Sequence, residues 1–216
     1  MAVSDASTLT AFGSSLTAIT LAELGDKTFF MALILAVRHR PRWVFVGAFT
    51  ALTAVTLLSL ALGFGLRELL PLALLPWVAA VLFLGFGAKL LVDAQGMAAD
   101  AIDCEAHQAE AAVEQAERRQ SGHGAWAVIW EAFALVFVAE LGDRTQLATI
   151  VLAAAPAFTL AGLVAGTLLG HALVTALAVG AGQWIGTRLS ERILYRLSGG
   201  LFLAFGLIAL LQALAR

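Results

Sequence analysis

Long apolar runs separated by short polar segments dominate the chain. Six runs approach or exceed the roughly 20 residues that a helix needs to cross a bilayer. They cover residues 9–37, 43–66, 72–92, 126–154, 158–185 and 189–214. The first and fourth runs are longer than one straight span requires, and each holds charged residues near its middle. The pattern therefore predicts an all-α membrane protein with six transmembrane helices, of which the first and fourth are tilted or broken.

The composition supports a membrane environment and excludes some partners. Of the 216 residues, 61% are hydrophobic and 13% are charged, whereas a soluble domain carries about 25% charged residues. The net charge of −2 gives no indication of a nucleic-acid partner. We expect a lipid bilayer around most of the surface, and the sequence does not predict an oligomeric state.

The placement of basic residues predicts the topology. Arginines gather in three of the connections between apolar runs: Arg38, Arg40 and Arg42; Arg118 and Arg119; Arg188, Arg192 and Arg196. The other side has Arg67 and Arg216. Because cytoplasmic loops are enriched in Lys and Arg, we expect these three connections in the cytoplasm and both termini outside it, in a bacterial inner membrane.

A repeated motif divides the chain into halves. AELGDKT at Ala22–Thr28 recurs as AELGDRT at Ala139–Thr145, and FLGFG at Phe83–Gly87 recurs as FLAFG at Phe202–Gly206. We therefore predict a three-helix repeat over residues 1–95, an acidic cytoplasmic linker helix within 96–124, and a second three-helix repeat over 125–216. Three helices per half place the second repeat in the opposite orientation. This is the inverted-repeat plan of secondary transporters, whose substrate site lies near the middle of the membrane.

The repeated motif carries four acidic residues: Glu23, Asp26, Glu140 and Asp143. An acid at the centre of a transmembrane helix costs roughly 2.5–3.5 kcal/mol on insertion scales, so intramembrane acids usually serve a function. A spacing of three places each Glu–Asp pair on one face of a helix. With Lys27 and Arg144, the site sums to a charge of −2. One divalent cation or two protons would neutralise it, which is the basis for predicting exchange of one for the other.

The neighbouring side chains are hard donors. Carboxylates, the hydroxyls of Thr28 and Thr145 and the amide of Gln146 suit Mg²⁺, Ca²⁺ or Mn²⁺. Gly25 and Gly142 would allow close helix contact, or a local break that frees backbone carbonyls. A purely structural alternative is an i,i+4 ion pair in each motif, Glu23 with Lys27 and Glu140 with Arg144.

Two further polar residues lie in apolar runs. His171, in the fifth run, is either a proton relay or a hydrogen-bonded interior histidine. Glu131 precedes the second motif by nine residues. We interpret it as an interfacial residue, with guidance of ions at the mouth of the site as the alternative.

At the repeated motif the chain resembles the cation/proton exchangers with a duplicated Glu-x-Gly-Asp-(Lys/Arg)-(Thr/Ser) signature, which include bacterial manganese exporters and Golgi manganese/calcium transporters. The resemblance covers both motifs, the six runs and the acidic linker. It implies that Glu23, Asp26, Glu140 and Asp143 bind the ion, with Thr28, Thr145 and Gln146 nearby. It also implies export against inward protons. The chain departs from the family pattern at Phe29, where Gln usually follows the Thr.

These observations predict a secondary transporter that exports Mn²⁺, or alternatively Ca²⁺, in exchange for protons. We expect no enzymatic activity and no cofactor beyond the transported ion. A passive divalent-cation channel would use the same acidic residues. An intramembrane aspartyl protease would need Asp26 and Asp143 to share a proton, which the basic residue after each Asp disfavours. A scaffold protein would tolerate neutralisation of all four acids.

Overall fold

The computed structural model describes residues 2–69, 71, 73–96, 104–119, 124–154, 159–185 and 191–215. The described residues form helices and contain no strand. The helices are α1 (Ala2–Glu23), α2 (Lys27–Arg38), α3 (Pro41–Leu69), α4 (Leu75–Gly96), α5 (Cys104–Arg119), α6 (Ala125–Glu140), α7 (Arg144–Ala154), α8 (Leu160–Ile185) and α9 (Glu191–Leu214). The predicted all-α class is confirmed, and α5 forms the charged helix expected in the linker.

Each of the two longest apolar runs is broken at its charged motif. The first run is α1 followed by α2, with residues 24–26 between them, and the fourth is α6 followed by α7, with residues 141–143 between them. The second pair bends by 69° at its break. Hydrophobicity alone left a tilted and a broken helix as alternatives, and the structure has the broken form in both places.

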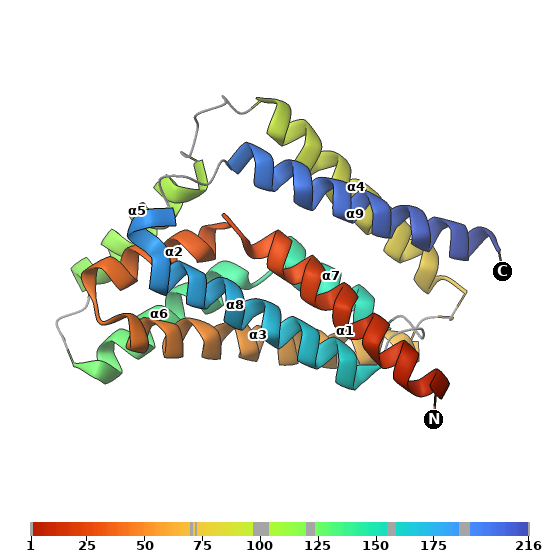
Figure 1. Ribbon diagram of the computed structural model, residues 1–216, viewed down its shortest axis with the longest axis horizontal. Helices are drawn as coiled ribbons and strands as arrows, with labels where there is room; N and C mark the ends of the chain where they lie inside the picture. The colour runs from red at the N-terminus through yellow and green to blue at the C-terminus, as the bar shows by residue number, and fades with distance from the viewer. Residues whose placement is uncertain are drawn as a thin grey trace.

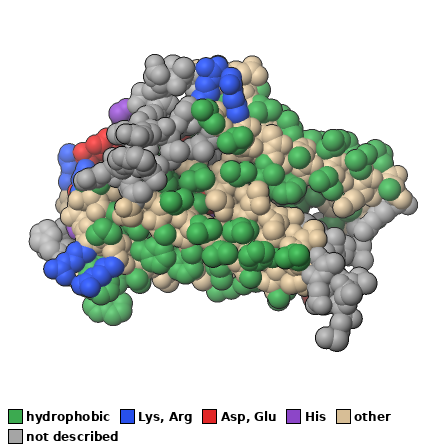
Figure 2. Space-filling model, in the orientation of Figure 1, with side chains coloured by type: hydrophobic (Ala, Val, Ile, Leu, Met, Phe, Trp, Pro, Cys, Tyr) green, Lys and Arg blue, Asp and Glu red, His purple; other side chains and the backbone are tan. Residues whose placement is uncertain are grey.

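Several helices are long and apolar enough to cross a bilayer. Within the described residues they are Pro41–Leu66, Leu75–Gly96, Leu160–Gly180 and Tyr195–Leu214, and the bent pair α6–α7 makes a fifth candidate. Large apolar side chains also lie on the outside of the helices, for example Val81, Val138 and Leu211, each more than half exposed. Figure 2 shows hydrophobic side chains, in green, spread over the flank of the molecule. Because water-exposed surfaces rarely carry so much apolar area, the chain is an integral membrane protein.

The helices run mainly along the long axis of the molecule (Figure 1). Both termini lie at one end, and α5 lies at the opposite end. The connection from α2 to α3 also lies at the α5 end, and basic side chains show in blue on that part of the molecule in Figure 2. Two of the three basic segments predicted to share one side of the membrane, those with Arg38 and Arg118, therefore lie at one end of the fold, whereas Arg188 of the third lies outside the described residues.

Helices of the two halves pack against one another across the molecule. Helix α1 packs along α8, α3 packs along α6 and α7, and α4 lies beside α9 (Figure 1). The rings of Phe83 and Phe202, from the repeated FLxFG segments, lie 5.9 Å apart. Two glycines permit equivalent close contacts. A Cβ on Gly47 would lie 2.8 Å from Ala132 Cβ, and one on Gly162 would lie 2.9 Å from Ala11 Cβ. A small residue at such a crossing lets two membrane helices pack backbone to backbone.

Candidate cation site

The two motifs fold into the same turn. Gly25 has φ +76° and Gly142 has φ +84°, a left-handed conformation that glycine adopts without steric cost. In each turn the amide of the Asp donates to the carbonyl of the preceding Glu, Asp26 N to Glu23 O and Asp143 N to Glu140 O, both at 3.2 Å. The prediction that each Glu–Asp pair shares one face of a continuous helix is therefore wrong. The acids of each pair are neighbours because the glycine ends one helix before the next begins.

These turns bring carboxylates from both halves together. Oxygen atoms of Glu23, Asp26 and Glu140 all lie within 4.8 Å of one another. Glu23 is the last residue of α1, Asp26 precedes α2, and Glu140 is the last residue of α6. All three are buried, and both glutamates are only 2% exposed. Acids this close in a low-dielectric interior repel one another unless a cation or protons intervene.

A threonine hydroxyl holds each glutamate in the same way. Thr28 Oγ1 donates to Glu23 Oε2 and Thr145 Oγ1 donates to Glu140 Oε2, each at 3.3 Å. The other oxygen of each glutamate, Oε1, is buried and accepts no hydrogen bond from the described residues. A buried carboxylate oxygen without a partner is costly. These two oxygens are therefore the donors available to a bound cation.

Asp143 lies differently from the other three acids. Its Oδ2 accepts from Thr145 N at 3.2 Å and lies 3.1 Å from Thr145 Oγ1, whose one proton it shares with Glu140 Oε2. It is half-buried and outside the group of three carboxylates that lie within mutual reach. The sequence predicted four equivalent acids, whereas the structure groups three of them and places Asp143 at the start of α7.

The basic residues of the motifs follow the same breaks. Lys27 begins α2, so it lies beyond the turn from Glu23 and does not continue the helix that carries this acid. The i,i+4 geometry needed for the structural ion pair is therefore interrupted. Lys27 is half-buried and lines a hollow together with Asp26. Arg144 begins α7, but its side chain lies outside the described part of the structure.

The position after each threonine distinguishes the halves. Gln146 Oε1 accepts a hydrogen bond of 2.6 Å from Gly142 N, which fixes the amide across the second turn. At the matching position Phe29 is buried, and its ring meets Phe30 edge-on with centroids 5.5 Å apart. In the second turn, the side chain of Gln146 therefore accepts the hydrogen bond of the glycine amide. In the first turn, the matching position holds the apolar ring of Phe29.

His171 joins the site from α8. Its Nδ1 lies 3.9 Å from Glu23 Oε1, and neither atom has a hydrogen-bond partner. The side chain lines one small cavity with Glu23 and Thr28, and a second with Glu140, Thr145 and Gln146. Among the described residues, the Nδ1 atom of His171 therefore makes none of the hydrogen bonds that the interior-histidine alternative expects.

A larger hollow extends from the carboxylates toward α5. Polar residues from both halves and from the linker line it: Asp26, Lys27, Lys89, Asp93, Glu105, Gln108 and Asp143. Tyr195 lines it as well, and its hydroxyl donates to Glu105 Oε1 at 2.6 Å. No pattern in the sequence places Glu105 beside Tyr195, because only the fold brings α5 and α9 together.

Comparison with known proteins supports a transport function for this constellation. A family model described as divalent cation/proton antiporter GDT1 matches the chain twice, over residues 11–98 and 128–216. These matches contain the first and second acidic turns, respectively. No solved structure matches the chain significantly.

Curated relatives are found in cyanobacteria and plants. The GDT1-like protein sll0615 of Synechocystis is 43% identical over 93% of this chain and 97% of its own length. The chloroplastic protein PAM71 of Arabidopsis thaliana is 41% identical over 93% of this chain, and the chloroplastic GDT1-like protein 1 of rice is 37% identical over 94% of it. The chain spans 56% and 62% of the lengths of these two plant proteins. By its double match and these relatives, the chain belongs to the GDT1 family of divalent cation/proton antiporters.

Proposed function

We propose that the chain exports Mn²⁺ from the cytoplasm in exchange for protons, at a site formed by Glu23, Asp26, Glu140 and Asp143. The supporting observation is the buried group of Glu23, Asp26 and Glu140, whose oxygens from both halves lie within 4.8 Å of one another. Asp143 completes the set by turning from Thr145 toward the ion. Thr28, Thr145 and Gln146 orient the acids, and Lys27 and Arg144 limit their total charge.

Charge neutrality provides the coupling. The four acids and two bases carry −2 when ionised, and such a site is unstable in a low dielectric. A divalent cation discharges it, and so do two protons. The conformational change is therefore easiest with either cargo bound and hardest with the site empty, which is the requirement for exchange.

His171 supports Mn²⁺ rather than Ca²⁺ as the cargo. Ca²⁺ takes oxygen ligands, whereas transition ions also accept imidazole nitrogen. The unpartnered Nδ1 lies 3.9 Å from Glu23 Oε1, so a small side-chain adjustment would let both atoms contact one ion. In the proton-loaded state, the same nitrogen relays protons to the carboxylates.

We further propose that α1–α2 is the sixth span and that the halves form an inverted repeat. The matching turns and the packing of α1 on α8 and of α6 on α3 support this arrangement. The gathering of basic side chains at the α5 end supports a cytoplasmic location for that end and both termini outside, in a bacterial inner membrane. The polar hollow at Asp26 and Asp143 would then be the cytoplasmic path to the site.

Proteoliposomes test the proposal. With the membrane potential clamped by K⁺ and valinomycin and the lumen acidified, the chain should accumulate Mn²⁺ above its external concentration while the lumen becomes more alkaline. Glu140→Gln should abolish both signals, because it removes a buried ligand. Glu114→Gln, a change on the exposed side of α5, should leave both unchanged.

The same assay distinguishes the alternatives. A passive channel would admit Mn²⁺ to its external concentration without a coupled change in lumenal pH. Uphill accumulation of Ca²⁺ but not Mn²⁺ would contradict the assigned cargo. Unchanged transport in Glu140→Gln would contradict the assigned site.

A further inference from the structure

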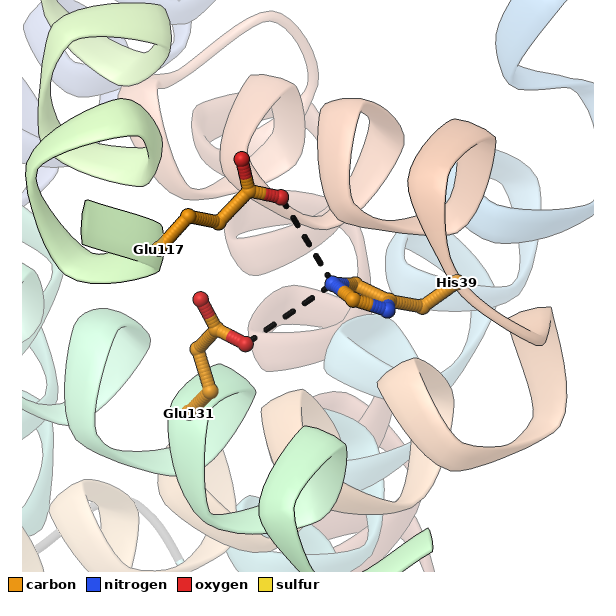
Figure 3. Close-up of side chains that lie close together, drawn as sticks. All are labelled: His39, Glu117 and Glu131. Atoms are coloured by element: carbon orange, nitrogen blue, oxygen red, sulfur yellow. Dashed lines mark ion pairs between the residues drawn. The ribbon is translucent and has the colours of Figure 1, made fainter. Parts of the chain in front are cut away.

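A second group of metal-ligating side chains lies at the α5 end, away from the repeated motif. It joins His39, at the end of α2, with Glu117 on α5 and Glu131 on α6 (Figure 3). One ligand atom from each residue lies within 4.8 Å of the other two. His39 Nε2 is 3.6 Å from Glu117 Oε1 and 3.8 Å from Glu131 Oε2. Figure 3 shows both carboxylates directed at this nitrogen from separate helices.

The spacing of these atoms is wider than a hydrogen bond. An N–H···O bond requires about 2.7–3.2 Å between heavy atoms, so neither carboxylate hydrogen-bonds to the imidazole. Donors held about 2.1 Å from a tetrahedral ion lie roughly 3.4 Å from one another. The distances of 3.6 and 3.8 Å are therefore closer to the spacing of ligands around a metal than to a direct contact.

Burial supplies independent support. The side chain of Glu131 is 5% exposed, although its position in the sequence favoured an interfacial residue. Among the described residues, Glu131 Oε1 has no hydrogen-bond partner, and neither does His39 Nε2. The Oε2 of the same carboxylate faces this ring nitrogen, so one ligand bound between the two side chains would serve both groups.

We propose that His39, Glu117 and Glu131 form a second divalent-cation site that neither transports ions nor depends on the repeated motif. One imidazole and two carboxylates suit a first-row transition ion such as Zn²⁺. They suit Ca²⁺ and Mg²⁺ less, because these ions favour oxygen ligands alone. Glu117 comes from the linker helix and the other two ligands from the helix bundle. A bound ion therefore ties α5 to α2 and α6, and links the position of the linker to the metal concentration at that end.

Nearby cations oppose binding only in part. Arg38 forms an ion pair with Glu117 Oε2, so Oε1 remains directed at His39. The Arg42 guanidinium lies over the Trp43 ring, 4.5 Å from its centroid. Arg40 lines the same surface hollow as His39 and Glu117. We therefore expect the site to bind more weakly than a closed structural zinc site.

The test counts Zn²⁺ bound to the purified full-length chain by calorimetric titration. It uses a Glu23→Gln, Glu140→Gln background, which removes both glutamates of the repeated motif. One Zn²⁺ should still bind, and His39→Gln, Glu117→Gln or Glu131→Gln should each weaken it at least tenfold. A tenfold excess of Ca²⁺ should not displace it. His107→Gln is the matched control, because His107 is also a histidine beside a glutamate but lies exposed on α5. Its Nδ1 is 3.9 Å from Glu110 Oε2.

Several results would overturn the proposal. They are the absence of a bound Zn²⁺ in the background protein, unchanged binding in His39→Gln, or an equal loss in His107→Gln. Glu117 is 29% exposed, so Glu117→Gln should fold even if the change at buried Glu131 does not, and gel-filtration profiles check this. Failure of antiport by the unaltered chain would refute the proposed function without affecting this binding result.

Discussion

The two acidic turns share a backbone and differ in their side-chain partners. In each, a left-handed glycine separates a helix-ending Glu from an Asp, and a threonine hydroxyl donates to the Glu at 3.3 Å. In the second turn, the carboxylate of Asp143 accepts a hydrogen bond from the Thr145 hydroxyl. The side chain of Gln146 accepts another from the amide of Gly142. In the first turn, Asp26 lies among the grouped carboxylates and Phe29 occupies the position of the glutamine.

This difference separates two requirements of the site. The parts that both turns share, the glycine, the glutamate and the threonine, set where the carboxylates lie. The parts that differ set which side chains hold each turn and which aspartate joins the two glutamates in one group. The first turn has its Asp in the carboxylate group, and the second turn is braced by its own side chains.

The largest effect should come from the two aspartates. We expect Asp26→Asn to lower Mn²⁺ transport roughly 100-fold, because it removes a member of the buried group, and Asp143→Asn to lower it roughly tenfold, because Asp143 gives up its hydrogen bonds to Thr145 when it turns to the ion. Initial Mn²⁺ uptake into proteoliposomes at several concentrations measures both. Equal losses would show that the two acids are equivalent during transport. A larger loss at Asp143 would reverse the assigned asymmetry.

An intermediate effect should come from the shared glycines. Gly25→Ala and Gly142→Ala should each cost about 1–2 kcal/mol, because L-residues are strained in the left-handed region. Thermal unfolding in detergent measures the loss, and the two variants should lose similar amounts.

Gly65→Ala is the control for these variants. Gly65 lies within α3, where an added Cβ meets no atom within 4 Å, and the change should stabilise the helix by up to about 1 kcal/mol. Wild-type stability in either turn variant would contradict the strained turn.

The smallest effect should come from the position after the threonine. Gln146→Leu removes the neutral hydrogen bond from the Gly142 amide, which contributes about 1 kcal/mol to holding the turn. Because the turn positions Glu140, the same loss should lower Mn²⁺ affinity about fivefold. Phe29→Gln should change Mn²⁺ affinity less than Gln146→Leu does. The native side chain at this position of the first turn is an apolar ring, so the change removes no hydrogen bond that holds the turn. Competition binding measures both. A larger effect of Phe29→Gln would show that this ring contributes to the site.

The sequence determined the local elements of this protein. Apolar run length predicted an all-α fold with several membrane-spanning helices, because only helices satisfy the backbone of a single segment in lipid, and it left tilted and broken helices as alternatives at the two motifs. The repeated motif predicted Glu23 and Glu140 as a pair, because two acids at corresponding depths of two repeats belong at the interface of the halves. Both predictions depend on residues close in the chain or on an internal repeat.

The tertiary structure decided what depends on contacts between distant segments. It placed Glu131 beside His39 and Glu117, and Glu105 beside the hollow next to the carboxylates, although none of these residues belongs to the repeated motif. It also grouped Asp26, but not Asp143, with the two glutamates, although the two turns have almost identical sequences. Local patterns predict which residues enter the membrane, but side-chain partners follow from how the helices pack against one another.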